Sequence, residues 1–149
     1  MVWGYFAANG VGELQQVSGI MDARSYLKLV SDAGLRSASK LIGSDCTYQQ
    51  DNDPKHTAKA VREFFSRSGV RLLQWPSQSP DLNPIEHLWD DLDQSLRAEP
   101  CQPTSADALF AMLKAQRRKT AAETTRALVA SLPRRLAEVI ENKGGATSF

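Results

Sequence analysis

The sequence predicts an α/β protein, and three patterns support this fold class. Apolar and aromatic residues surround an Asn9-Gly10 pair near the N-terminus, which is a strong signal for a β-hairpin. An apolar run, a helical repeat and a second apolar run then follow one another over residues 46–75. Such a strand, helix, strand unit favours a right-handed crossover that places its two strands parallel in one sheet. Helical segments fill much of residues 101–149, so we expect extra C-terminal helices.

The hairpin is expected over residues 2–17, and helical sequence follows it. Asp22 can cap a first helix, because an aspartate oxygen accepts from the free backbone N–H groups of a first turn. The apolar positions of this helix follow helical spacing and are Tyr26, Leu29, Val30 and Ala33. Gly34 is a possible break, and a second helical stretch is expected from Leu35 to Leu41.

The strand, helix, strand unit begins with a short strand at Cys46–Gln50. Asp51-Asn52-Asp53-Pro54 stops this strand, because proline removes a backbone donor and restricts the residue before it, so Asp51 lies at a strand end. Thr57 is expected to cap the next helix. The buried face of that helix carries Ala60, Val61, Phe64 and Phe65. Gly69 is expected to end it, and Val70–Trp75 resumes as a strand.

The second half predicts a loop and several helices. Pro76–Pro84 reads as an extended loop, whose polar residues Ser79, Asp81 and Asn83 are expected to fix its conformation through side-chain to backbone hydrogen bonds. The helix after it carries on one face Leu88, Trp89, Leu92 and Leu96. Glu86 occupies its first turn, where the helix dipole keeps a carboxylate ionised. Later helical segments are expected near Ser105–Gln116, Ala121–Ser131 and Pro133–Asn142. The three tryptophans look like core or core-edge residues: Trp3, Trp75 and Trp89.

Composition fits one small globular domain. The 149 residues are 42% hydrophobic and 23% charged, which excludes a disordered chain. The net charge of +1 gives no independent support for tight nucleic-acid binding. Basic residues cluster at Arg117-Arg118-Lys119 and Arg134-Arg135, which we interpret as solvated helix faces in preference to phosphate contacts.

Cysteine usage and hydropathy indicate an intracellular, soluble protein. Cys46 and Cys101 are the only cysteines, and no cysteine and histidine spacing suggests zinc, so a reducing compartment is the simpler inference. No run approaches the roughly 18 apolar residues of a membrane helix. The N-terminus also lacks a basic flank followed by an apolar signal core.

Two acidic residues carry most of the functional information. Asp51 lies in Gln-Gln-Asp-Asn-Asp-Pro-Lys-His-Thr, and Glu86 lies in Trp-Pro-Ser-Gln-Ser-Pro-Asp-Leu-Asn-Pro-Ile-Glu-His-Leu-Trp, with a gap of 34 residues between them, 52–85. Each carboxylate lies where a strand or a loop gives way to a helix, so both could meet at one edge of a sheet. Hard cations prefer carboxylate oxygens, and two-metal sites need several of them. The pattern favours phosphoryl transfer at a divalent metal, with one carboxylate fewer than such a site usually has.

The two motifs resemble the DDE transposases of the mariner superfamily. The resemblance runs nearly end to end and includes Met1–Gly4, Gly19–Asp22, both acidic motifs, Ser131–Arg135 and Lys143–Thr147. It implies an RNase H-like fold and an Asp, Asp, Glu metal triad whose second and third members match Asp51 and Glu86. It further implies Mg²⁺ or Mn²⁺ as cofactor, transposon and target DNA as partners, a nuclear location, and DNA contacts by Lys55 and His56.

The chain departs from the family at the first triad position, which in the family lies upstream of the Val-Trp-Gly segment. The aspartates before Asp51 lie outside the required strand context, and they are Asp22, Asp32 and Asp45. We therefore expect the C-terminal part of a catalytic domain, an incomplete RNase H-like fold without its first, central strand. Residues 1–100 would be the RNase H-like part and residues 101–149 the helical part. Such a chain is expected to be inactive and to self-associate through unpaired strand edges.

Several alternatives stay open from the sequence. His56 could contact DNA, orient a carboxylate or satisfy a local hydrogen bond, and His87 reads as surface structure. Asp53 reads as a turn residue that could assist a metal or cap Lys55. The chain could also be a non-catalytic module that binds DNA or another protein. A nucleotide-sugar transferase would use Asp51-Asn52-Asp53 on a metal diphosphate, but this class does not explain the loop before Glu86.

Overall fold

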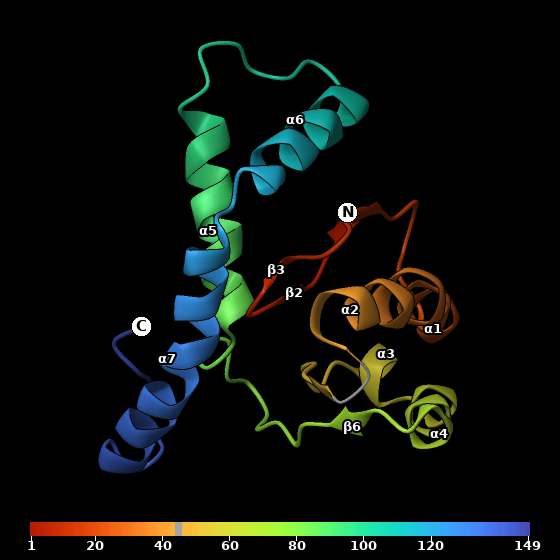
Figure 1. Cartoon of the computed structure of the whole chain (residues 1–149), viewed down its shortest axis with the longest axis vertical. Coiled ribbons are helices and arrows are strands. Elements are labelled where there is room, and N and C mark those ends of the chain that lie inside the picture. Colours follow the sequence, from red (N-terminus) through yellow and green to blue (C-terminus); the bar gives the residue numbers. More distant parts are fainter. Residues whose placement is uncertain (44–45) are drawn as a thin grey trace. The chain divides into compact units, whose positions relative to one another are not determined.

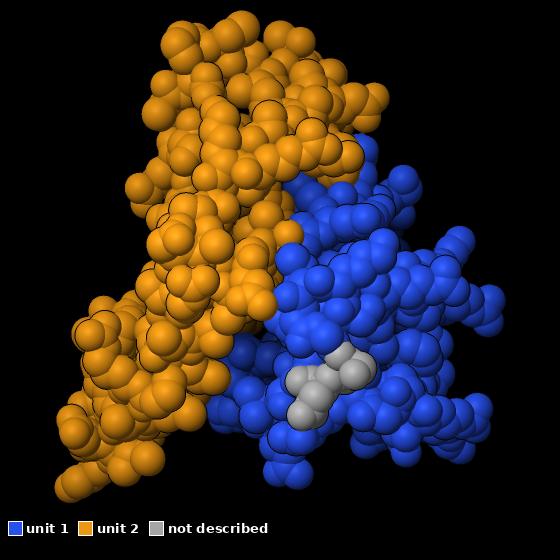
Figure 2. Space-filling model, viewed as in Figure 1, with its two compact units in different colours: residues 1–5, 12–78 blue, residues 6–11, 79–149 orange. Residues whose placement is uncertain are grey.

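The computed structural model describes residues 1–43 and 46–149, and it divides them into two compact units (Figures 1 and 2). Unit 1 comprises residues 1–5 and 12–78, and unit 2 comprises residues 6–11 and 79–149. The chain therefore passes between the units three times, after residues 5, 11 and 78. Asp45 lies outside the described residues, so its predicted lack of strand context stays a prediction.

Two antiparallel strand pairs form the predicted hairpin. In unit 1, β1 (Val2–Trp3) pairs with β4 (Gln15–Gln16), with Val2 opposite Gln16. In unit 2, β2 (Phe6–Ala7) pairs with β3 (Gly10–Val11), with Ala7 opposite Gly10. The predicted turn is wrong by one residue: the turn residues are Ala8 and Asn9, while Gly10 opens the return strand at a φ of 142°. Only glycine adopts such a backbone angle without strain, which explains the Asn-Gly signal.

One continuous helical stretch follows in unit 1. Asp22 caps α1 (Ala23–Leu29) as predicted, because its Oδ1 accepts from the Ser25 N–H at 2.8 Å in a capping box. The possible break at Gly34 does not occur, since the chain continues through the π-helical segment η1 (Val30–Gly34) into α2 (Leu35–Ile42). Gly34 is instead a packing residue, because a Cβ there would lie 3.2 Å from the Trp3 ring.

The strand, helix, strand unit is parallel, as predicted. β5 (Thr47–Tyr48) pairs with β6 (Arg71–Leu72), and the Leu73 N–H extends the ladder to the Tyr48 carbonyl at 2.8 Å. Both strands are shorter than the predicted 46–50 and 70–75. Two helices connect them, α3 (Pro54–Thr57) and α4 (Lys59–Ser68).

The capping assignments in this connection are partly wrong. Asp53 caps α3 and Ala58 precedes α4, whereas Thr57 was predicted to be the cap. Thr57 is instead the last residue of α3, where its hydroxyl donates backwards to the Asp53 carbonyl at 3.3 Å. Gly69 ends α4 in the left-handed conformation, at a φ of 70°, as predicted.

The core of unit 1 lies between these helices and the strands. Its buried members are Val17, Met21, Tyr26, Val30, Val61 and Phe65. The Tyr48 ring lies 5.0 Å from the Phe65 ring, and Trp3 packs against the same cluster as a partly buried residue. α1 and α4 therefore bury most of the predicted faces, but Ala60 is exposed and its predicted burial is wrong. The end of β5 is attached to a packed core.

Unit 2 consists of the tip of the hairpin and three helices. α5 (Pro84–Arg97) buries Leu88, Leu92 and Leu96, as its spacing predicts, and Ser105 caps α6 (Ala106–Arg118). The predicted break between residues 131 and 133 is wrong, because α7 (Ala122–Glu141) is one helix with Pro133 inside it. An interior proline costs about 3 kcal/mol. Packing offsets this cost, since α7 contacts β2 and β3 and carries two fully buried polar residues.

The sheets are small in the described part of the chain. Three two-stranded sheets are present, and β5 has β6 as its hydrogen-bonded neighbour. No helix among residues 1–43 and 46–149 is both long and apolar enough to cross a membrane.

Candidate active site

Asp51 lies three residues beyond the end of β5, at the strand end that the sequence predicts. Its Oδ1 accepts hydrogen bonds from the Asp53 N–H at 3.0 Å and from the imidazole Nδ1 of His56. The side chain is 56% exposed, and Oδ2 makes no hydrogen bond within the described residues. One oxygen of this carboxylate is therefore anchored, and the other faces solvent.

Local contacts set the shape of the loop that carries Asp51. Asp53 caps α3 by accepting from the Lys55 N–H at 2.9 Å, and its other oxygen pairs with the Lys55 ammonium. The hydrogen bond from the Lys55 side chain lowers the pKa of Asp53 below its usual value. Asn52 donates to the Trp75 carbonyl at 2.6 Å and so ties the loop to the segment after β6. The alternative in which Asp53 is a turn and capping residue agrees with this geometry.

A buried polar layer lies beneath the same loop, and the sequence did not predict it. The Tyr26 hydroxyl donates to Gln50 Oε1 at 2.7 Å, and Gln50 Nε2 donates to the His56 carbonyl at 3.1 Å. The Tyr26 ring also packs on the His56 ring, with 4.1 Å between the centroids. Burial raises the pKa of Tyr26 and raises that of Tyr48 to about 12, so both phenols are neutral donors near pH 7. α1 thereby holds the loop in place.

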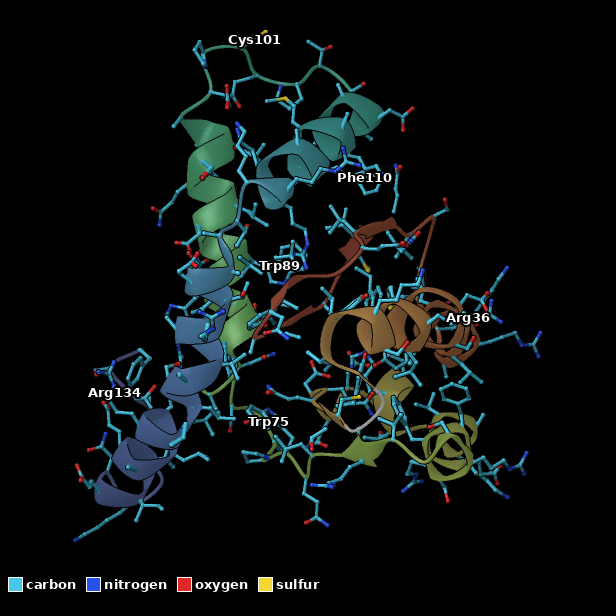
Figure 3. All side chains as sticks on the ribbon, in the orientation of Figure 1. Arg36, Trp75, Trp89, Cys101, Phe110 and Arg134 are labelled. Carbon is cyan, nitrogen blue, oxygen red and sulfur yellow. The ribbon has the colours of Figure 1, made fainter. Side chains whose placement is uncertain are left out.

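A pocket of about 380 Å³ opens beside Asp51 within unit 1. It is lined by Gln50, Asp51, Asn52, His56, Thr57, Arg62, Leu72, Leu73, Gln74 and Trp75. Trp75, labelled in Figure 3, is half-buried in its wall, which agrees with a core-edge position. The pocket thus combines one carboxylate, one guanidinium and an apolar wall.

Glu86 lies in the first turn of α5, as predicted. Its N–H donates to the Asn83 carbonyl at 3.1 Å, and Asn83 Nδ2 lies 3.5 Å from Glu86 Oε1. The side chain is exposed at the positive end of the helix dipole, which favours its ionised form. Pro84 at the start of α5 fixes the entry of the chain into this turn.

The loop before Glu86 is held partly by the C-terminal segment. The Asp81 carboxylate interacts with backbone groups of its own loop, as predicted, and its Oδ2 also accepts from the Thr147 N–H at 2.9 Å. This bond lowers the pKa of Asp81. The Asp81 carbonyl in turn accepts from Arg135 Nη1 at 2.6 Å. Residues far apart in the sequence therefore fix the approach to α5 within unit 2.

The prediction that both basic clusters are solvated is wrong for one arginine in each. Arg135 is 1% exposed and Arg117 is 2% exposed, whereas their neighbours Arg118, Lys119 and Arg134 are exposed as predicted. Arg135 Nε donates to Ser131 Oγ at 2.9 Å, and Nη1 donates to His87 Nε2 at 3.0 Å. The Arg117 guanidinium stacks over the Trp89 ring at 5.2 Å. Both buried arginines are structural. Figure 3 labels Trp89 and Arg134.

The chemistry of the two motif carboxylates suits Mg²⁺ or Mn²⁺, which prefer oxygen ligands. Each residue offers one such ligand: Asp51 has an open Oδ2, and Glu86 has an exposed carboxylate. Asp51 belongs to unit 1 and Glu86 to unit 2. Across residues 1–43 and 46–149, no group of three or more histidine, cysteine, aspartate or glutamate side chains is arranged to hold a metal ion. The structure brings His56 to Asp51 and Lys55 to Asp53.

Comparison with known sequences places both motifs in one family. A family model described as DDE superfamily endonuclease matches residues 49–107, a span that contains Asp51 and Glu86. Over 149 residues the chain is 41% identical to the Tc1 transposable element transposase of Caenorhabditis elegans and 40% identical to the Tcb1 transposase of Caenorhabditis briggsae. The alignments cover 100% of this chain and 54% of each relative. The chain thus spans about half the length of these relatives.

Solved structures share the fold. The catalytic domain of Mos1 transposase with raltegravir and Mg matches with a TM-score of 0.89 at 19% identity, covering 99% of this chain and 76% of that one. The form with Mn matches with a TM-score of 0.87 at 20% identity, over 99% and 76% of the two chains. A Mos1 strand transfer complex matches with a TM-score of 0.85 at 22% identity, over 99% and 43%. These matches confirm the predicted α/β fold of the RNase H-like class.

Proposed function

Because this chain belongs to the mariner-type DDE transposases, we propose that Asp51 and Glu86 are two of the three carboxylates with which the whole protein cuts and joins DNA strands. The observation that carries the proposal is the state of Asp51, a carboxylate at a strand end with one oxygen anchored and the other open to solvent. A ligand of this kind is oriented before the metal arrives, which is what a metal site requires of its donors.

Bound Mg²⁺ or Mn²⁺ would supply charge for the attacking and leaving oxygens of an in-line displacement at a phosphodiester. Within this chain, Asp51 would offer Oδ2 while the Asp53 N–H and His56 hold Oδ1. Glu86 would offer an exposed carboxylate that the N-terminus of α5 keeps ionised. The Mg and Mn forms of the Mos1 catalytic domain support the choice of these two ions.

We propose that the 149-residue chain by itself has no strand cleavage or strand transfer activity. Two of the aspartates that precede Asp51 have other tasks. The Asp22 carboxylate closes the capping box of α1, and Asp32 is an exposed residue of η1, not of a strand. Neither is placed to act as the first triad residue.

The test is activity of the chain with and without a family N-terminal segment that carries the first Asp. The chain alone is expected to leave inverted-repeat DNA uncut in Mg²⁺ or Mn²⁺, and the grafted protein is expected to cut and join it. Asp51→Ala and Glu86→Ala should each abolish that activity, while Asp90→Ala, an exposed aspartate of the same α5 helix, should not. Turnover by the chain alone would contradict the inactivity proposal, and active Ala variants would contradict the site assignment.

DNA is the proposed partner, and a nuclear location follows from that proposal. Two neighbours are a Mos1 paired-end complex with the left transposon end and a Mos1 strand transfer complex. Lys55 and His56 remain the proposed DNA contacts. The Lys55 ammonium is already paired with Asp53, so its contribution to phosphate binding should be small. The salt dependence of DNA binding by wild type and Lys55→Met measures it, since each phosphate contact contributes roughly one unit of slope.

A non-catalytic module that binds DNA or protein stays the alternative, and the net charge of +1 is compatible with either partner. The geometry of the loop argues against the nucleotide-sugar transferase alternative. Both oxygens of Asp53 are engaged with Lys55, so the Asp-x-Asp pair does not present two open carboxylates to a metal diphosphate. The same salt titration separates a DNA-binding module from a protein-binding one, because a protein-binding module would show no salt-dependent affinity for DNA.

A further inference from the structure

We infer that His56 is a positioning residue, which orients the Asp51 carboxylate for a divalent cation and is itself held by Tyr26 and Gln50. The inference rests on the proposed function of Asp51 as a metal ligand. It requires the imidazole Nδ1 to hydrogen-bond to Asp51, which a DNA contact by His56 would not require. Four residues of unit 1 carry it: Asp51, His56, Tyr26 and Gln50.

The chemistry of the His56–Asp51 contact fixes the direction of the hydrogen bond. An ionised carboxylate only accepts, so Nδ1 of His56 must carry the hydrogen and donate it to Asp51 Oδ1. The Asp53 N–H donates to the same oxygen. Two donors on Oδ1 set the rotation of the carboxylate about its last side-chain bond, a torsion that is otherwise broad. Oδ2 is then the oxygen that points away from the loop.

The Tyr26 ring holds the imidazole, Gln50 holds the backbone of the same residue, and neither hydrogen-bonds to Asp51. Its ring packs on Tyr26, which is 1% exposed, and the His56 side chain is only 13% exposed. Gln50 joins the two, because it accepts from the Tyr26 hydroxyl and donates to the His56 carbonyl. Rotation of the ring would break the stack as well as the hydrogen bond to Asp51. The ring is therefore a fixed donor, which an exposed surface histidine is not.

Outer-shell hydrogen bonds of this kind matter to metal affinity. Removing one commonly lowers the affinity of a protein site about 10- to 100-fold, because the ligand then has to be ordered when the metal binds. Asp51 and His56 both line the pocket described above, so the ligand and its donor lie beside a space that a cation can enter. The contribution of His56 should therefore appear as affinity for the ion.

The experiment measures Mn²⁺ binding to the full 149-residue chain through the electron paramagnetic resonance signal of free Mn²⁺. His56→Phe keeps a ring to pack on Tyr26 and removes the donor, and it should weaken binding about 10- to 100-fold. His56→Asn places an amide N–H near the position of Nδ1 and should restore most of the affinity. His87→Gln, which changes the other histidine of the chain but keeps an acceptor for Arg135, is the matched control and should bind like wild type. Asp51→Asn reports on the ligand itself.

The outcomes separate this inference from the proposed function. If Asp51→Asn loses binding while His56→Phe binds like wild type, His56 does not position the ligand and only this inference is overturned. If Asp51→Asn binds like wild type, or if wild type takes up no Mn²⁺, Asp51 is not a ligand in this chain and the inference is overturned. The proposed function of the whole protein is then decided separately, by the activity of the grafted chain and its Asp51→Ala variant.

A second measurement does not depend on a folded variant. The ¹⁵N spectrum of the wild-type imidazole should show a protonated Nδ1 at neutral pH, and an unprotonated Nδ1 would overturn the inference. Addition of Mg²⁺ should shift this signal, because the ion changes the charge on Asp51, which accepts its hydrogen bond.

Discussion

Replacing Arg135 with methionine is expected to destabilise unit 2 by about 2 kcal/mol. The guanidinium is 1% exposed and donates to the Asp81 carbonyl at 2.6 Å and to Ser131 Oγ at 2.9 Å. Hydrogen bonds from a charged donor contribute about 1.5–3 kcal/mol each. The stack on Phe149, at 4.5 Å, adds about 0.5–1 kcal/mol.

The net loss should be smaller than the sum of these contributions. Burial lowers the pKa of Arg135, which shows that its charged form carries a desolvation cost. Methionine avoids that cost and keeps an apolar side chain in the same space, so the expected loss lies near the strength of one charged hydrogen bond.

Arg134→Met is the matched control for this prediction. Arg134 is exposed and stacks on the same Phe149 ring at 4.5 Å, but it has none of the buried hydrogen bonds of Arg135. Its replacement should cost at most about 1 kcal/mol. Urea denaturation followed by circular dichroism measures both, and the Arg135 variant should also melt about 5 °C lower. Equal losses in the two variants, or a more stable Arg135→Met protein, would refute the reasoning, because desolvation would then outweigh the hydrogen bonds.

Further predictions test single elements. Gly69→Ala should cost about 1 kcal/mol in urea denaturation, because an L-residue is strained at a φ of 70°, and Gly69→Asn should cost less. Ser105→Ala should cost about 1 kcal/mol, since its hydroxyl caps α6 at 3.1 Å from the Ala108 N–H. The Asp81 pKa is lowered, so the stability from the bond to Thr147 is present above the usual value of 3.8 and is lost as the pH falls through the lower folded value. The Thr147 amide shift should report that midpoint, and a titration centred above 3.8 would contradict it. The described sheets are only two-stranded, so their edges should cause self-association, with weak hydrogen-exchange protection in residues 2–17. A monodisperse monomer with that hairpin protected would refute this last expectation.

Short sequence patterns were sufficient to predict the elements whose structure depends on neighbouring residues. The cap at Asp22, the left-handed Gly69 and the parallel strands around α4 each depend on a few neighbouring residues. The cap of α3 also has a local signal. Pro54 occupies the first turn of α3, and proline at that position marks the residue before it, Asp53, as the cap.

Long-range packing decides what the sequence did not predict. Pro133 indicates a helix end, but Arg135 in the next turn binds Asp81, 54 residues away in the chain, and α7 stays continuous. In the candidate site, the motif was sufficient to select Asp51 and Glu86. The role of Tyr26 was not predictable, because its spacing matched the apolar face of α1 and its partner Gln50 lies 24 residues further along. Only the folded chain shows that this apolar position also carries a hydrogen bond to the loop.

The division of the hairpin between the two units imposes an order on protein synthesis. Residues 6–11 are made well before their packing partner in unit 2, α7. The Thr125 hydroxyl donates to the Ala8 carbonyl across 117 residues of sequence. A ribosome that adds about 5–20 residues per second reaches α7 roughly 5–20 s after it has made β3. During that interval residues 12–78 of unit 1 are complete, whereas residues 6–11 do not yet have α7 to pack against. Unit 2 can therefore close only after α7 has been made.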